Sequence, residues 1–289
     1  MDTPLSATHT VLSGLAFPEG PRWHDGRLWF ADMHAYEVVA TTVDGQRSTQ
    51  ASVPHQPSGL GWLPDGRMLV VSMTDRRLLR QEHDGNLVLH ADLSHLAPWH
   101  CNDMVVDRVG RAYVGNFGWD MLGRTTDPSL TNLIRVDPDG SCHEVASGLN
   151  FPNGAVITPD GSTLIVGESG ARCLTAFSIG ADGSLTDRRT WALLPEGSTP
   201  DGICLDAEGA IWSACPRTGT VWRVAEGGEV LGSVAVDAAL KSYACMLGGD
   251  DGCTLFVCAA GSAMPDDCRS KLDGRIFSVR VAVPHAGLP

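Results

Sequence analysis

The feature that most constrains the fold of this chain is a sequence block that recurs six times. Each block contains a turn-forming pair, a polar residue at a nearly constant place, an apolar stretch, a turn centred on glycine and a second apolar stretch. The blocks occupy residues 17–33, 56–73, 100–117, 151–169, 199–216 and 242–260. Their turn glycines are separated by 40, 44, 51, 48 and 43 residues, and they are Gly26, Gly66, Gly110, Gly161, Gly209 and Gly252. Repeats of this length that hold several short strands are typical of propeller blades.

Turn signals also mark the second half of most repeats. Asp-Gly pairs flanked by strand-like residues are strong hairpin signals, and Gly227-Gly228 takes the same place in the fifth repeat. The four Asp-Gly pairs are Asp44-Gly45, Asp84-Gly85, Asp139-Gly140 and Asp182-Gly183. The sequence therefore predicts an all-β six-bladed β-propeller with four antiparallel strands per blade, formed as a single domain by residues 1–289.

Both ends of the repeat array have the character of strands. Residues 9–15 and 274–283 are apolar enough to join a sheet. A ring of blades needs protected edges. We therefore expect the N-terminal strand to complete the last blade.

Composition narrows the classes of partner. The formal net charge of −13 argues against nucleic acid and anionic membranes as partners. The N-terminal residues lack the pattern of a secretion signal, and no apolar run reaches the length of a membrane span. The nine cysteines show no CxxC spacing and mostly lie in apolar strands, so we expect reduced core thiols in a cytoplasmic protein. Oligomeric state is left open.

The polar residue of each block is the candidate for function. It lies eight residues before the turn glycine in four blocks, as Ser58, Asn102, Asn153 and Asp201, and seven before it in the first, as Glu19. In four blocks it stands between proline and glycine. Proline fixes the backbone φ and glycine allows close approach of the backbone, so one side chain is directed toward the axis. A plain turn with Asn or Asp bonded to its own backbone would explain any one block. Glutamate is not favoured in turns of this kind, so Glu19 is not explained in this way.

Glu19, Asn153 and Asp201 all carry oxygen donors. If each block opens the innermost strand of its blade, these side chains face one axis. Carboxylates that converge in a protein interior must be neutralised or protonated. Two carboxylates and an amide oxygen suit a hard divalent cation.

The segments FPEGPRW, HCNDMVVD, FPNG and PDGICLDAEGAIWSA resemble those of the senescence marker protein 30, gluconolactonase and luciferin-regenerating enzyme family of six-bladed propellers. The resemblance extends over essentially the whole chain. It implies that Glu19, Asn153 and Asp201 bind one divalent metal ion, which could be Ca, Zn, Mg, Mn or Fe. It also implies that Asp201 accepts and donates the proton in catalysis.

The resemblance assigns substrate contacts as well. The family's Arg-x-Asn-Asp stretch falls on residues 100–103, so that Asn102 and Asp103 match and His100 replaces the arginine. A further carboxylate that contacts substrate falls near Asp120 by an ungapped count from Asn102. These four residues are the predicted substrate-binding set.

The predicted reaction is hydrolysis of a lactone. A metal with open positions polarises an ester carbonyl and activates water. Asp201, by resemblance, or Asp103, by proximity, would carry the proton to the leaving alkoxide. Two alternatives stay open at this point. One is other acid and base chemistry in the same pocket, and the other is a scaffold that binds structural calcium without catalysis.

Substrate choice follows from the departure at His100. Imidazole offers fewer donors to a polyhydroxylated or anionic ligand than guanidinium does. Trp99, Phe117 and Trp119 make this region apolar. The sequence therefore predicts a preference for smaller or less hydroxylated lactones. The histidines in predicted loops or ends, including His34, are expected to be solvated.

Overall fold

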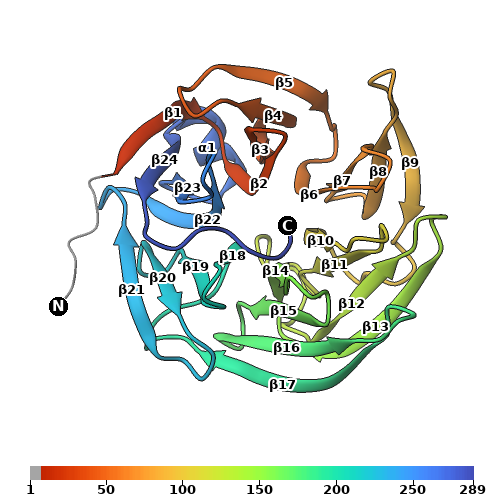
Figure 1. Ribbon diagram of the computed structural model, residues 1–289. Coiled ribbons are helices and arrows are strands. Elements are labelled where there is room, and N and C mark those ends of the chain that lie inside the picture. The colour runs from red at the N-terminus through yellow and green to blue at the C-terminus, as the bar shows by residue number, and fades with distance from the viewer. Residues whose placement is uncertain (1–7) are drawn as a thin grey trace.

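A computed structural model describes residues 8–289, which form six four-stranded antiparallel sheets arranged as blades around a central axis (Figure 1). The predicted six-bladed β-propeller is confirmed. The first blade contains β2 (Pro18–His24), β3 (Arg27–Asp32), β4 (Glu37–Thr41) and β5 (Arg47–Ser52). The second contains β6 (Pro57–Trp62), β7 (Met68–Ser72), β8 (Arg77–Gln81) and β9 (Leu87–Asp92). The third contains β10 (Cys101–Val106), β11 (Ala112–Asn116), β12 (Thr131–Val136) and β13 (Cys142–Leu149).

The last three blades follow the same order. The fourth contains β14 (Pro152–Ile157), β15 (Thr163–Glu168), β16 (Cys173–Ile179) and β17 (Leu185–Leu193). The fifth contains β18 (Ile203–Leu205), β19 (Ile211–Cys215), β20 (Thr220–Val224) and β21 (Val230–Ala235). The sixth contains β22 (Lys241–Gly248), β23 (Thr254–Ala260), β24 (Gly274–Arg280) and β1 (His9–Leu15). Each blade begins at the axis, where β2, β6, β10, β14, β18 and β22 contact their neighbours around the ring.

The N-terminal strand closes the ring as the sequence predicts. β1 pairs antiparallel with β24, from His9 opposite Ser278 to Leu15 opposite Gly274. The outer edge of the sixth blade is therefore supplied by the opposite end of the chain. Since this strand pairs residues more than 250 positions apart, it joins the first and last blades without a covalent link.

The turn glycines of the repeat adopt the left-handed backbone that such turns require. Gly66 and Gly110 have φ values of 85° and 92°, and the other four turn glycines also have positive φ. Residues with a Cβ rarely adopt this conformation. The recurring glycine is thus a requirement of the turn between the two inner strands of each blade.

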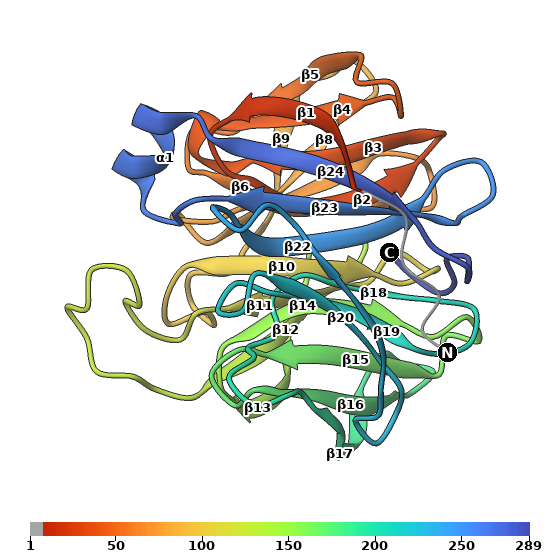
Figure 2. The same ribbon diagram turned by 90° about the vertical axis from the view of Figure 1, so that its left-hand side faces the viewer.

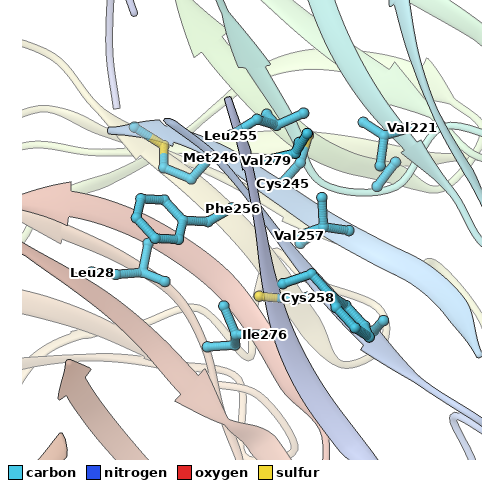
Figure 3. Close-up of a cluster of buried hydrophobic side chains, with 14 of the residues drawn as sticks. Leu28, Val221, Cys245, Met246, Leu255, Phe256, Val257, Cys258, Ile276 and Val279 are labelled. Carbon is cyan, nitrogen blue, oxygen red and sulfur yellow. The ribbon is translucent and has the colours of Figure 1, made fainter. Parts of the chain in front are cut away.

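The core lies between neighbouring blades. β23 contributes a run of fully buried residues, in which Leu255, Phe256, Val257 and Cys258 have no exposed surface. These side chains pack with residues of β3, β20, β22 and β24 (Figure 3). All nine cysteines are free thiols and seven of them are buried, which agrees with their expected place in the core.

The two faces of the ring differ. One face carries the short helix α1 (Pro265–Lys271) and the long β11–β12 loop, and the C-terminal segment crosses the other face (Figure 2). That segment is held by hydrogen bonds between Leu288 and Ile157, with N to O distances of 2.8 and 2.9 Å.

Within residues 8–289, no helix is long and apolar enough to cross a membrane. α1 and the 3₁₀ helix η1 (Met33–Ala35) add two short helices to the blades.

Candidate active site at the propeller axis

A β-bulge occurs at the polar position of most inner strands. In β2, β6, β10 and β14 the inner strand has one residue more than the neighbouring strand between two consecutive pairs. These bulges lie at Glu19–Arg22, Pro57–Leu60, Cys101–Met104 and Pro152–Ala155. A bulge leaves a residue outside the ladder and changes the direction of its side chain. Ser58, Asn102 and Asn153 therefore lie inside the bulges of their strands, whereas Glu19 pairs with Ala31 directly before the bulge of β2.

Asp201 reaches the axis in a slightly different way. The assigned strand β18 begins at Ile203, so Asp201 precedes the strand that it was expected to open. Its backbone N nevertheless donates to Ala214 O at 2.9 Å, which continues the pairing with β19. Asp201 thus occupies the same place in its blade as the bulge residues do in theirs.

The glycines that follow the polar residues allow neighbouring blades to approach. A Cβ on Gly154 would lie 2.6 Å from Ile203 N, and one on Gly59 would lie 2.5 Å from Met104 N. Real Cβ atoms do not tolerate such contacts. This confirms the expectation that glycine here serves close approach of the backbones at the axis.

A cavity of about 110 Å³ lies at the axis. Its polar residues are Glu19, Asn102, Asn153, Asp201 and His34. Its apolar residues include Phe17, Met33, Met73, Phe117, Met121 and Phe151. The structure thus brings Glu19, Asn153 and Asp201, from the first, fourth and fifth blades, into one cavity.

The two carboxyl groups of the cavity hold their protons unusually tightly. Burial, with smaller contributions that include the charge of Asp103, raises the pKa of Glu19 to about 8. Burial and then the charge of Glu19 raise the pKa of Asp201 well above its usual range. Each group keeps some accessible surface because it faces the cavity, but protein surrounds it and removes most of its solvation. Perturbation of this kind is typical of functional sites.

Asn153 is oriented by its neighbours. Its Nδ2 donates to Ser169 Oγ at 3.1 Å, and its side chain also hydrogen-bonds to the Asp201 carboxylate. Ser169 Oγ in turn donates to Pro200 O at 2.6 Å. Since the amide NH₂ is engaged in this way, the carbonyl oxygen is the atom that remains to bind a ligand.

The donor set fits a hard divalent cation. Two carboxylates and an amide oxygen are the ligands that such cations prefer. A cation would favour the charged forms of both carboxyl groups and so oppose the burial that raises their pKa values. No three His, Cys, Asp or Glu side chains cluster as a metal site anywhere in residues 8–289. The candidate set is not such a cluster, because its third donor is an asparagine.

Asn102 and Ser58 form a neighbouring polar pair. Ser58 Oγ donates to Asn102 Oδ1 at 3.3 Å, and Asn102 lines the cavity. This bond turns the amide so that its NH₂ group can donate to a ligand. The geometry agrees with the predicted role of Asn102 in substrate binding, which stays a prediction.

Asp103 is engaged in a buried ion pair. Its Oδ1 accepts from Arg22 Nη2 at 2.5 Å and from Met104 N at 2.8 Å. Arg22 also donates to the carbonyl oxygens of Pro21, Leu60 and Met104. These bonds tie the first three blades together beneath the cavity. They favour Asp201 over Asp103 as the proton carrier.

We expect Asp103→Asn to act mainly on stability. Removing the charge leaves Arg22 buried without its counter-ion, which should lower the free energy of unfolding by about 3 kcal/mol. The kcat of the folded variant should stay within about tenfold of wild type, a change of about 1.4 kcal/mol. Urea unfolding and steady-state kinetics measure the two effects separately. As a control, Asp65→Asn removes an exposed acid that pairs with Arg67 and should leave the free energy of unfolding almost unchanged. Loss of hydrolysis at unchanged stability would contradict this assignment and make Asp103 the base.

His100 and Asp120 lie near the site but do not line the cavity. His100 stacks on Trp99, with ring centroids 5.1 Å apart, and its Nδ1 is buried without a hydrogen-bond partner among the described residues. Burial lowers the pKa of His100, which favours the neutral ring. The Asp120 carboxylate accepts from Gly123 N, Thr125 N and Thr125 Oγ1 and so braces its own loop. Direct substrate contact by either residue stays a prediction.

His34 corrects the expectation of a solvated surface histidine. It is 2% exposed, lines the cavity and stacks on Phe17 with centroids 5.1 Å apart. Burial lowers its pKa, and a neutral ring fits both neighbours: Nε2 donates to Ala263 O at 3.2 Å and Nδ1 accepts from Gln56 Nε2 at 3.4 Å. The loop that buries it comes from the far end of the chain.

The repeat holds a signal for the cavity wall, of which only Phe117 was expected from the sequence, and the expected Trp99 and Trp119 do not line the cavity. In four blades the residue after the second strand donates its N–H to the residue two positions before the polar one: Met33 to Phe17, Met73 to Gln56, Phe117 to His100 and Ser169 to Phe151. Five residues at these corners line the cavity. Tyr243 was missed because its bulge, between Ser242 and Ala244, lies nine residues before Gly252 instead of eight.

Comparisons with known proteins agree with this architecture. A pentonolactonase, XacC, from Haloferax volcanii is 28% identical over 96% of this chain and 95% of its own length. A regucalcin from Danio rerio is 31% identical over 88% of this chain and 86% of its own. The solved structure of the gluconolactonase XC5397 from Xanthomonas campestris superposes with a TM-score of 0.74 at 25% identity, over 96% of this chain and 89% of that one.

A family model matches most of the chain. The model for the SMP-30/gluconolactonase/LRE-like region matches residues 17–261, which include all six inner strands and every residue that lines the axial cavity except Ala263. The chain therefore belongs to the SMP-30/gluconolactonase/LRE-like family.

Proposed function

We propose that this protein is a lactonase that depends on one divalent metal ion, bound by Glu19, Asn153 and Asp201. The observation that carries the proposal is the pair of buried, mutually repelling carboxyl groups on the floor of an open axial cavity. A pentonolactonase and a gluconolactonase among its relatives support the reaction class. The identity of the metal among Ca, Zn, Mg, Mn and Fe depends on geometry and supply.

A divalent cation in this site supplies Lewis acidity, which polarises a carbonyl and lowers the pKa of nearby water. The chain supplies the remaining parts. Asp201 accepts a proton from the attacking water and returns it to the alkoxide that leaves when the ring C–O bond breaks. Asn102 donates a hydrogen bond that orients the lactone. The product is the open hydroxy acid, and the enzyme returns to its initial protonation state.

Partners and location form part of the same proposal. The partner is a small lactone, and the net charge of −13 disfavours nucleic acid and anionic membranes. Nine free thiols, seven of them buried, fit a reducing cytoplasm.

The test is a panel of lactones assayed with metal-free protein and with each divalent metal restored. Sugar lactones and alkyl lactones are both included, and acid release is followed at constant pH. We expect hydrolysis that is absent in the metal-free protein and restored by at least one metal. A protein that binds metal in calorimetry and hydrolyses none of the panel would be a scaffold, and the lactonase proposal would fail.

A further inference from the structure

Most side chains in the wall of the axial cavity cannot hydrogen-bond to a ligand. The polar residues that line this cavity, Glu19, Asn102, Asn153 and Asp201, are called its floor, and its wall contains Phe17, Met33, Met73, Phe117, Met121 and Phe151. Tyr243 adds one hydroxyl, and its ring packs against the edge of Phe17 with centroids 4.7 Å apart. Phe117 and Phe151 form a second aromatic pair with centroids 4.7 Å apart, and both pairs belong to one apolar cluster that includes Met33 and Met73.

The polar side chains close to this wall are already engaged by the protein. Both ring nitrogens of His34 have partners, in Ala263 O and Gln56 Nε2. The carboxylate of Asp120 is occupied by three donors of its own loop. Apart from the Tyr243 hydroxyl, a ligand hydroxyl directed at these wall side chains would therefore meet carbon or sulfur.

The consequence for substrate choice is direct. The ester group of a lactone must lie at the floor, so the other ring substituents point toward the wall. Each hydroxyl that is buried there without a partner lowers kcat/KM by roughly tenfold, whereas an alkyl group gains from burial. Methionine side chains adapt to different shapes, so the three in the wall should accept substituents of different length.

We infer that the substrate is a small γ- or δ-lactone that carries an alkyl or aryl group where a sugar lactone carries hydroxyls. This inference rests on the proposed lactonase function and specifies its substrate class. It separates this chain from the activity named for its pentonolactonase relative.

The test compares two δ-lactones, δ-octanolactone and D-glucono-δ-lactone, on the metal-loaded protein. Each kcat/KM is divided by the rate constant for hydroxide-promoted opening of the same lactone, because the hydroxyls of the sugar lactone raise its intrinsic reactivity. We expect the corrected value for δ-octanolactone to be at least about tenfold higher. Equal values, or a higher value for the sugar lactone, would overturn the inference and leave the lactonase function standing.

A matched pair of variants locates the selectivity in the wall. Met121→Gln adds an amide to the cavity at nearly constant volume and should lower the preference by roughly fivefold, mainly by improving the sugar lactone. Met264→Gln makes the same change at a site that is 47% exposed and does not line the cavity, and it should leave the preference unchanged. Equal effects of the two variants would show that the selectivity does not arise in this wall.

Binding of lactams that resist hydrolysis separates this inference from the proposed function. Calorimetry compares an alkyl δ-lactam with the lactam of gluconic acid. Tighter binding of the alkyl lactam supports an apolar ligand class even if neither lactone is hydrolysed. Tighter binding of the sugar lactam, or no binding of the alkyl one, overturns the inference.

Discussion

Asp201→Asn should lower kcat by roughly 10²–10⁴-fold, the range expected for loss of a general acid and base. The variant keeps the shape and the hydrogen-bonding partner Asn153, but it cannot accept a proton from water. It also removes one negative charge from the site and so weakens metal binding. Kinetics at several metal concentrations separate the two effects, because added metal restores only the second.

Asp103→Asn is the appropriate comparison for this variant. Both changes replace a buried aspartate near the axis, but the Asp103 carboxylate is held by Arg22. A variant at Asp201 that turned over within tenfold of wild type when saturated with metal would show that another group carries the proton.

Glu19→Gln should abolish tight metal binding and hydrolysis while the propeller stays folded. The substitution keeps the side-chain shape and removes one of two ligand charges. Metal content after dialysis and the rate of hydrolysis measure the loss directly. As a control, Glu226→Gln changes an exposed acid that pairs with Arg189 and should alter neither quantity. Full metal content and full turnover in the Glu19→Gln variant would refute the site.

The same variant should change how stability depends on pH in the metal-free protein. The pKa of Glu19 is raised from an ordinary 4.5 to about 8, so the folded state binds its proton more tightly than the unfolded state does. This contribution to stability is fully present below about pH 4.5 and is lost as the pH rises to about 8. Each pKa unit corresponds to about 1.4 kcal/mol, so wild type should lose a few kcal/mol relative to Glu19→Gln between pH 5 and pH 8. Urea unfolding with a chelator at both pH values measures this difference, and parallel curves for the two proteins would contradict it.

Much of the fold was predictable because its signals are local and repeated. The turn glycines adopt positive φ, the hairpin pairs lie between strands, and Gly59 and Gly154 permit close approach at the axis. The turn glycines and hairpin pairs act within a few residues, whereas Gly59 and Gly154 act on the backbone of the neighbouring blade. Because the block occurs six times, the pattern of strands and turns can be recognised without knowledge of any distant contact.

Three site residues were predictable for the same reason. Glu19, Asn153 and Asp201 have corresponding places in their blades, and a ring of equivalent blades brings corresponding places to one axis. The structure confirms that they share a cavity, whereas their role as metal ligands stays a proposal. Tyr243 was not predicted because one extra residue displaces it from the common spacing.

The sequence by itself determined the propeller, the closure by the N-terminal strand and the position of the axial polar residues. The tertiary structure decided which of the polar groups near the axis remain available. Asp103 is paired with Arg22, which is 81 residues away, and His34 is buried against Ala263, which is 229 residues away. The physical reason is that burial and pairing of a charged or polar group depend on which blades meet around it. The local sequence pattern places a side chain at the axis. Residues distant in the sequence decide whether that side chain is protonated, paired with another residue or free to bind a ligand.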